Sequence, residues 1–326
     1  VLWRTGKNGY TAMDWYDAAD PRPDYYRNLP SYYWMDNKDY GRLNFEKAAW
    51  AKDAWINDIP EYTHLNWDRL YNVNWNNYDA DGLRRSKYAV EERRVDQNDI
   101  NLNASVKWMA SKAFTLTGGV NYKWNRTEYY KKMDDLLGGD YYLNIDQFAE
   151  RDFASSPTMV QNDLDYFLEF GEAKSLKEGD KYGYDYYAHV RNANLWANGA
   201  LDLGGFKANL ALEAGYAKFW REGLVRKGLF AGLDENGNEM MYEGKVLTTY
   251  DAKTGKAITS KGNSEIADFL TYSAKLGLQY HFEGGHRIYA NGAYFNDAPT
   301  FAQSFISPRT RNSMVPNLTT VKTASA

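Results

Sequence analysis

Apolar and polar residues alternate along six stretches of the chain, and short turns join these stretches into three pairs. In the first pair, every second residue is apolar from Ile100 to Trp108 and again from Phe114 to Trp124, around a turn at Met109–Ala113. A period of two places the apolar residues on one face of a strand and the polar residues on the other. The first pair therefore predicts a β-hairpin with one face suited to hydrocarbon and one suited to water.

The same pattern recurs twice. Residues 193–203 and 206–216 alternate around Gly204-Gly205, and residues 272–282 and 288–294 alternate around Glu283-Gly284-Gly285. Gly-Gly pairs favour short hairpin turns because glycine readily adopts positive φ angles. The runs 114–124 and 272–282 each contain 11 residues, and a tilted strand needs about 9–11 residues to cross a bilayer.

Aromatic residues on the apolar faces gather at both ends of these runs, whereas Ala, Leu, Val and Gly fill the middles. Those near the short turns are Trp108, Phe114, Phe206, Tyr280 and Phe282, and those near the long connections are Tyr122, Trp124, Tyr216, Trp220 and Tyr272. Two aromatic girdles around an aliphatic band are typical of a transmembrane β-barrel. A soluble β-sandwich is the alternative, but it rarely combines minimal turns on one side with long loops on the other.

Long connections separate the hairpins. The predicted division is a loop region at 1–85, a hairpin at 86–125, a loop at 126–183, a hairpin at 184–221, a loop at 222–265, a hairpin at 266–295, a loop at 296–317 and the start of a further strand at 318–326. The fold class that this predicts is all-β: a segment of an antiparallel transmembrane β-barrel with about seven strands, short periplasmic turns and long extracellular loops. Because bacterial single-chain barrels have an even number of strands, starting at about 8, we expect a larger barrel.

Three local features refine this prediction. Turns at Asn236-Gly237 and Thr254-Gly255 indicate a β-ribbon in the third loop. Residues Lys131–Gly139 are compatible with the start of a short helix. The apolar positions change from even to odd near Arg191-Asn192, which indicates either a β-bulge there or a strand that starts later.

Composition agrees with this fold. The chain has 326 residues, 44% of them hydrophobic, yet its mean hydropathy is −0.70. No run approaches the ~18 consecutive apolar residues of a transmembrane helix, so insertion into a membrane would be by strands. The net charge is −4 without a basic stripe, which argues against a nucleic-acid partner. Without cysteine, disulfides and thiolate metal sites are excluded.

No pattern of catalytic residues emerges. The four histidines, His64, His189, His281 and His286, lack metal-ligand spacing, and nucleophile-elbow, phosphate-loop and dinucleotide motifs are missing. Asp234, Asn236 and Asn238 match the first ligands of a calcium loop, but Lys245 stands where its final Glu would be, which favours a hairpin turn. We therefore expect no enzyme, no cofactor and no metal site.

Several loop segments resemble a known family. They are Thr11–Tyr16 followed by Asp20–Tyr32, Asp134–Tyr142 with Asp146–Asp152, and Phe305–Arg309. In this order and spacing they resemble loop signatures of TonB-dependent outer-membrane receptors of Bacteroidetes-type bacteria. The resemblance covers the extracellular half of the barrel region.

The resemblance implies a nutrient receptor in the bacterial outer membrane, with its loops facing the cell exterior. Such receptors are barrels of ~22 strands with a plugged lumen, and they import a nutrient such as a glycan, a siderophore-like chelate or a peptide. Their implied partners are the lipid bilayer, an energy-coupling protein that acts through the plug, and a possible surface lipoprotein lid. This chain departs from the family because it shows neither the plug, nor the energy-coupling box, nor a final strand ending in an aromatic residue.

A ligand surface on the loops is expected to use aromatic and guanidinium groups, since rings stack on sugars or planar chelates and Arg pairs with carboxylates. The candidate ligand-binding residues are Trp15, Tyr16, Arg22, Tyr25, Tyr26, Trp34, Tyr141 and Arg309. Alternatively, these rings form the small cores that keep long loops ordered. Two other functions stay open: a non-transporting outer-membrane barrel or surface anchor, and a secreted soluble all-β module for glycan binding or adhesion.

Overall fold

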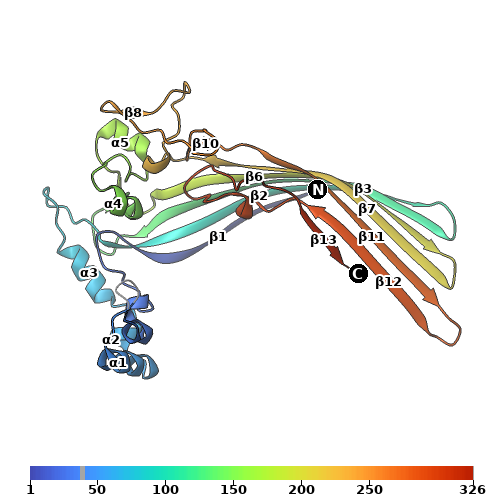
Figure 1. Ribbon diagram of the computed structural model, residues 1–326, viewed down its shortest axis with the longest axis horizontal. Helices are drawn as coiled ribbons and strands as arrows, with labels where there is room; N and C mark the ends of the chain where they lie inside the picture. Colours follow the sequence, from blue (N-terminus) through green and yellow to red (C-terminus); the bar gives the residue numbers. More distant parts are fainter. Residues whose placement is uncertain (37–40, 326) are drawn as a thin grey trace. The chain divides into compact units, whose positions relative to one another are not determined.

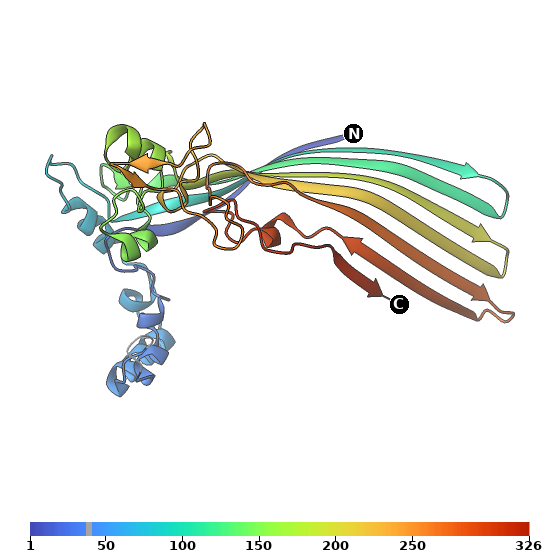
Figure 2. The same cartoon turned by 45° about the horizontal axis from the view of Figure 1, so that its top comes forward.

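The computed structural model describes residues 1–36 and 41–325, so residues 37–40 and Ala326 of the predicted ranges 1–85 and 318–326 lie outside it. The described chain is mostly β, a large open antiparallel sheet of long strands with a few helices (Figures 1 and 2). The main sheet has nine described strands in the order β1-β2-β3-β6-β7-β11-β12-β13, with β10 paired to β7. The sheet is not closed into a barrel, and β1 and β13 are its two edges.

The strands and helices have the following bounds. The main sheet contains β1 (Leu2–Trp15), β2 (Tyr88–Met109), β3 (Phe114–Asp135), β6 (Lys181–Asp202), β7 (Phe206–Gly223), β10 (Gly262–Asn263), β11 (Ala267–His281), β12 (Arg287–Asp297) and β13 (Val321–Ser325). Two small pairs are β4 (Tyr142–Leu143) with β5 (Ser175–Leu176), and β8 (Met241–Tyr242) with β9 (Lys245–Val246). The helices are η1 (Tyr26–Asn28), η2 (Pro30–Trp34), α1 (Phe45–Ile56), α2 (Pro60–Thr63), α3 (Trp67–Trp75), α4 (Gln147–Phe153), α5 (Leu164–Phe170), η3 (Gly228–Phe230) and α6 (Phe301–Ser304).

The chain divides into two compact units. Unit 1 comprises residues 1–8, 94–130 and 184–326, and unit 2 comprises residues 9–93 and 131–183. Among the described residues, no helix combines the length and the apolar character needed to cross a membrane.

The three predicted strand pairs are present, as β2 with β3, β6 with β7, and β11 with β12, and their short turns lie in unit 1. Strands β2 and β3 are joined by residues 110–113, where the Ser111 hydroxyl accepts hydrogen bonds from the backbone N–H groups of Ala113 and Phe114. Strands β6 and β7 pair without interruption from Tyr186 opposite Gly223 to Asp202 opposite Lys207. In Figures 1 and 2 the three short turns lie at one end of these strands.

The two faces of unit 1 differ as the alternation predicts. We call the face that bears Leu116, Leu195, Leu212 and Leu276 the apolar face, and the opposite one the polar face. The apolar face is open, with Leu195 64% and Leu212 50% exposed. On the polar face, a small core of Phe219, Ala267 and Phe305 packs with Phe269, Phe301 and Met314 near the loops. A large hydrocarbon surface therefore stays uncovered, while the loop end of the polar face is packed.

The main sheet contains two described strands beyond the seven that were predicted. Strand β10 comes from the loop at 222–265, where the predicted turns are present at Gly237 and Gly255, both with positive φ. Strand β1 lies inside the region predicted as loop. Its residues do not alternate cleanly, since Trp3 and Tyr10 fall on opposite faces and glycines and polar residues separate them. The periodicity was therefore too weak to indicate a strand.

Three strand limits also differ from prediction. Strand β3 continues to Asp135, so the short helix suggested at Lys131–Gly139 is wrong, and a turn follows with positive φ at Leu137 and Gly138. Strand β6 already begins at Lys181, and its regular pairing with β7 excludes both the bulge and the later start proposed near Arg191-Asn192. The alternation fades in these extensions because loops bury side chains on the polar face as well.

Unit 2 contains the helices α1 to α5, whose starts follow from local sequence. Asn44 caps α1, Asn66 caps α3, Asp146 caps α4 and Asp163 caps α5, each by accepting a hydrogen bond from a backbone N–H of the first turn. One core of unit 2 joins Tyr16, Ala89, Met133, Leu136, Tyr142, Leu176 and Tyr182. This core anchors the segment that follows β1.

Candidate ligand-binding surface

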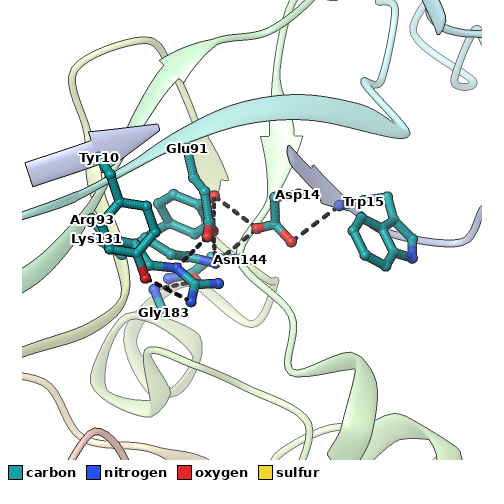
Figure 3. A network of polar contacts seen from close by, with 9 residues as sticks. Tyr10, Asp14, Trp15, Glu91, Arg93, Lys131, Asn144 and Gly183 are labelled. Carbon is teal, nitrogen blue, oxygen red and sulfur yellow. Dashed lines mark hydrogen bonds and ion pairs between the residues drawn. The ribbon is translucent and has the colours of Figure 1, made fainter. Parts of the chain in front are cut away.

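A buried ionic network fixes the end of β1 in unit 2. The Lys131 ammonium lies 2.7 Å from the Asp14 carboxylate and 2.7 Å from that of Glu91, so one cation joins β1, β2 and β3 (Figure 3). The Tyr182 hydroxyl donates a 2.7 Å hydrogen bond to Asp14, and Arg93 donates a 2.5 Å bond to Glu91. The Glu91 side chain is only 1% exposed. These contacts leave the chain little freedom where the predicted ligand surface begins.

The charges of this network support one another. Burial alone would raise the pKa of Asp14, but the charge and hydrogen bond of Lys131 outweigh it and the pKa is lowered. Burial opposes the charge on Lys131, yet Asp14 and Glu91 together raise its pKa. Asp14 and Lys131 are therefore both ionised at neutral pH, as a structural ion pair rather than an acid–base pair.

Tyr16 belongs to the interior rather than to the exposed surface that the sequence predicted. It is 9% exposed, lies in the core of unit 2, and donates a 2.7 Å hydrogen bond from its hydroxyl to Glu150. Next to it, Asp17 accepts hydrogen bonds from Arg85 at 2.9 Å and Lys87 at 3.0 Å. The alternative interpretation, a ring that orders its own loop, applies to Tyr16.

Trp15 and Arg22, both predicted ligand residues, are brought together. The Arg22 guanidinium lies 5.1 Å from the centre of the Trp15 ring. It is held by Asp20, to which it donates hydrogen bonds of 2.6 and 2.9 Å. The side chain of Arg22 stays 51% exposed. The pair thus presents a fixed guanidinium over an indole at the surface of unit 2.

Tyr25 and Tyr26 are also in contact, and they continue into a row of four tyrosines with Tyr32 and Tyr33. Successive rings meet edge to face, with centres 4.7, 5.7 and 5.2 Å apart. The Arg27 guanidinium lies 5.9 Å from the Tyr25 ring and 5.5 Å from the Tyr26 ring, and donates a 2.9 Å hydrogen bond to the Tyr26 hydroxyl. Edge-to-face packing brings the edge of one ring against the face of the next and orders the row.

Two further predicted residues of unit 2 lie in other contacts. Trp34 ends η2 and is 60% exposed. Tyr141 donates a 2.8 Å hydrogen bond to Asp79, and burial followed by that carboxylate raises its pKa to about 12. Trp34 thus remains a candidate surface residue, while the Tyr141 hydroxyl holds a turn at residues 79–82.

The remaining predicted residue, Arg309, belongs to unit 1, where its guanidinium lies 5.3 Å from the Tyr184 ring. Near it is a residue that sequence reasoning missed. Arg221 is 2% exposed and donates hydrogen bonds to Asn312 and to the carbonyl groups of Pro308 and Ser260. Burial lowers its pKa to about 10. Because Arg221 continues an alternating strand, nothing in its sequence position distinguished it.

The loops of unit 1 also enclose a cavity of about 600 Å³ between residues 251–269 and 306–318. Its polar lining includes Asn263, Ser264 and Asn312, and its apolar lining includes Ile266, Phe269 and Met314. Ligand pockets commonly measure about 300–1,000 Å³ and combine apolar walls with a few polar groups. The loops of unit 1 therefore offer a second place for a ligand.

These surfaces present aromatic rings, guanidinium groups and amides. Within residues 1–36 and 41–325, no group of three or more His, Asp or Glu side chains is placed to hold a metal ion. Ring faces, guanidinium groups and amides recognise sugars, planar groups and carboxylates. In comparisons with known proteins, no family profile, no curated protein and no solved structure matches this chain.

Proposed function

We propose that the chain forms part of the barrel of a TonB-dependent outer-membrane receptor, which takes up a nutrient bound by its long loops. The observation that carries the proposal is the open apolar face of unit 1, an aliphatic band bounded by aromatic rings at both ends. A surface of this kind is rarely left exposed to water, because large apolar patches mark a site of contact with another molecule or a membrane. Lipid hydrocarbon is the contact that an aliphatic band between two aromatic girdles fits.

Strand length supports the same proposal. Strand β7 has 18 residues, whereas a tilted strand needs about 9–11 to cross a bilayer. In this proposal residues 206–216 cross the membrane from the short turn, and residues 217–223 rise above it toward the loops. Residues 114–124, 193–203 and 272–282 are the corresponding membrane-crossing segments of the neighbouring strands.

The open sheet requires further strands in this proposal, because an unpaired sheet edge is not tolerated in lipid. Additional strands of the receptor would pair with β1 and β13 and complete the barrel. A plug elsewhere in the receptor would gate passage and receive energy from the inner-membrane partner. The location is then the bacterial outer membrane, with the loops exposed to the cell exterior.

The ligand, in this proposal, is a nutrient with hydroxyl, planar or carboxylate groups, such as a glycan, a chelate or a peptide. The tyrosine row with Arg27, the Trp15–Arg22 pair and the cavity in the loops of unit 1 are the candidate contacts. A lipoprotein lid over these surfaces is compatible with the proposal. The role is one of binding and transport rather than catalysis.

Cell fractionation of the full-length protein tests the proposal. We expect it in the outer membrane, and we expect it to migrate faster on a detergent gel when unheated than when boiled, as closed barrels do. Uptake of the nutrient should then require the energy-coupling system. A membrane barrel without such uptake would favour the surface anchor. A soluble protein without the heat-dependent shift would refute the barrel and favour the secreted β-module.

A further inference from the structure

Two arginines and three aromatic rings gather on the apolar face of unit 1. The Arg191 guanidinium lies 4.6 Å from the Trp124 ring centre and 5.3 Å from that of Trp220. The Arg126 guanidinium lies 4.8 Å from the Tyr187 ring centre and 6.0 Å from that of Trp124. We call these five residues the outer arginine cluster. Both cations therefore share one indole, on the face that carries the aliphatic band.

The cluster is held rigidly by its surroundings. Arg191 donates hydrogen bonds of 2.7 and 2.9 Å to the backbone carbonyl groups of Asn125 and Val190. The Trp220 ring stacks on His189 at 4.6 Å with an angle of 6° between the ring planes. His189 in turn is 2.7 Å from the Glu222 carboxylate. The Glu222 carboxylate on this face is thus hydrogen-bonded to the histidine.

In the part of the chain that the structure describes, neither of the two guanidinium groups, that of Arg126 or that of Arg191, is paired directly with a carboxylate. Burial, and to a smaller degree the neighbouring Arg126, lower the pKa of Arg191. A guanidinium nevertheless stays protonated in proteins. Each of the two guanidinium groups therefore lacks a direct carboxylate partner among the described residues, although the Glu222 carboxylate lies beside His189 on the same face.

The position of the cluster defines which anion fits. Trp124 is the last residue of the crossing segment 114–124, and Arg191 lies two residues before the segment 193–203. In the proposed orientation this is the level of the lipid headgroups, where aromatic rings settle and where Lys and Arg meet anionic lipid. A free ligand in the barrel lumen could not reach this face, because it points away from the lumen.

From these contacts we infer that the outer arginine cluster binds the phosphate group of a membrane lipid in the outer leaflet. The inference rests on the proposed function. The planar forks of Arg126 and Arg191 donate to phosphate oxygens, and the rings of Trp124, Tyr187 and Trp220 pack beside the glycerol or sugar part of the headgroup. Acyl chains then continue along the aliphatic band below.

Lipid titration followed by native mass spectrometry tests this inference on the full-length, delipidated receptor. The probes are phosphatidylglycerol and a diacylglycerol with the same acyl chains, which lacks the phosphate. We expect the wild type to retain phosphatidylglycerol in preference to diacylglycerol. In the double variant R126Q/R191Q the dissociation constant of phosphatidylglycerol should rise about tenfold or more, because both positive charges that face the phosphate are lost.

The matched control is K112Q/K207Q, which removes two positive charges near the short turns and should leave lipid binding unchanged. Three results would overturn the inference. R126Q/R191Q could bind phosphatidylglycerol as tightly as the wild type does, or K112Q/K207Q could lose as much affinity for it as R126Q/R191Q does. The wild type could also retain diacylglycerol as well as it retains phosphatidylglycerol. Competition by inorganic phosphate without any preference for phosphatidylglycerol would also overturn it. The heat-dependent gel shift separates the two proposals. If the wild type shows no shift, the barrel proposal is refuted. If R126Q/R191Q shows the shift, this variant is folded, and a change in its lipid binding concerns the cluster alone.

Discussion

Replacing Lys131 with Met tests how unit 2 is held together. In the wild type, one buried ammonium satisfies the carboxylates of Asp14 and Glu91 at 2.7 Å each. The variant keeps Arg93 beside Glu91 at 2.5 Å. Asp14 loses its cation and retains the Tyr182 hydroxyl and a backbone N–H as hydrogen-bond donors. The main defect of the variant is therefore one buried carboxylate without a counter-ion.

The expected cost follows from that defect. Removing one partner of a buried ion pair typically costs about 3–5 kcal/mol, because the other charge is left uncompensated. Since Arg93 still serves Glu91, we expect a loss near the lower end, about 3 kcal/mol, in the free energy of unfolding. The double variant K131M/D14N removes both charges together and should recover most of this loss.

The pH dependence gives the result its sign. In the wild type the pKa of Asp14 is lowered, so its contribution is present above the unfolded pKa of a carboxyl and is lost as the pH falls. In K131M, where the charge of Lys131 is removed, we expect burial to raise the pKa of Asp14. The defect should therefore be largest at neutral pH and shrink as the pH falls and Asp14 takes up a proton. Urea unfolding between about pH 4 and 8, followed by tryptophan fluorescence, measures both effects.

Two outcomes would refute this reasoning. One is a loss below about 1 kcal/mol in K131M, the size of an exposed ion pair. The other is a loss that stays constant with pH, which would show that Asp14 escapes to solvent when its cation is removed. A K131M/D14N variant less stable than K131M alone would point to a packing role of the lysine stem instead.

Three further predictions concern unit 1. Leu116→Arg should reduce the heat-shifted outer-membrane fraction far more than Thr117→Arg, because an Arg at the bilayer midplane on the lipid face costs about 2–4 kcal/mol; equal tolerance would contradict the assignment of the two faces. Arg221→Met should leave two buried backbone carbonyl groups without a donor and lower the stability of these loops by about 2–3 kcal/mol. We expect faster proteolysis of residues 255–265 and 305–315. Unchanged cleavage would mean that other contacts hold the loops. Gly119→Ala places a Cβ 2.5 Å from a backbone oxygen of β2 and should lower the temperature at which the gel shift occurs. Gly292→Ala, whose Cβ meets no atom within 4 Å, is the control. An equal change of this temperature in both variants would reject the steric explanation.

The three hairpins were predictable because one rule applies along their whole length. Between Phe114 and Trp124, each side chain lies on either the open apolar face or the polar face. The alternation of apolar and polar residues alone therefore predicts the strand. The same rule fails in the upper part of β6, where Tyr182, Tyr186 and Ala188 are buried on the polar face by loops. Because loops cover the polar face there, apolar and polar residues no longer alternate in the strand. Its start at Lys181 could therefore not be predicted from alternation.

The candidate surface was predictable only in part, for a related reason. Composition indicates that aromatic and arginine residues gather in the loops, but it cannot tell a ring that faces solvent from one that supports the loop. Tyr26 is exposed and Tyr25 beside it is partly exposed, whereas Tyr16 lies in the core. The difference depends on Glu150, which accepts the Tyr16 hydrogen bond from a position 134 residues away along the chain. Such long-range partners leave no local signal in a sequence.

The short turns of unit 1 have a consequence for the order in which the protein folds. Strands β6 and β7 begin pairing at Asp202 and Lys207, so the first contacts close a loop of a few residues and later contacts follow one by one. By contrast, β11 must find β7 across a connection of more than 40 residues. The entropic cost of closing a loop grows with its length, and local contacts form faster. We therefore expect each hairpin to form as a unit before the hairpins join, so that the sheet grows two strands at a time.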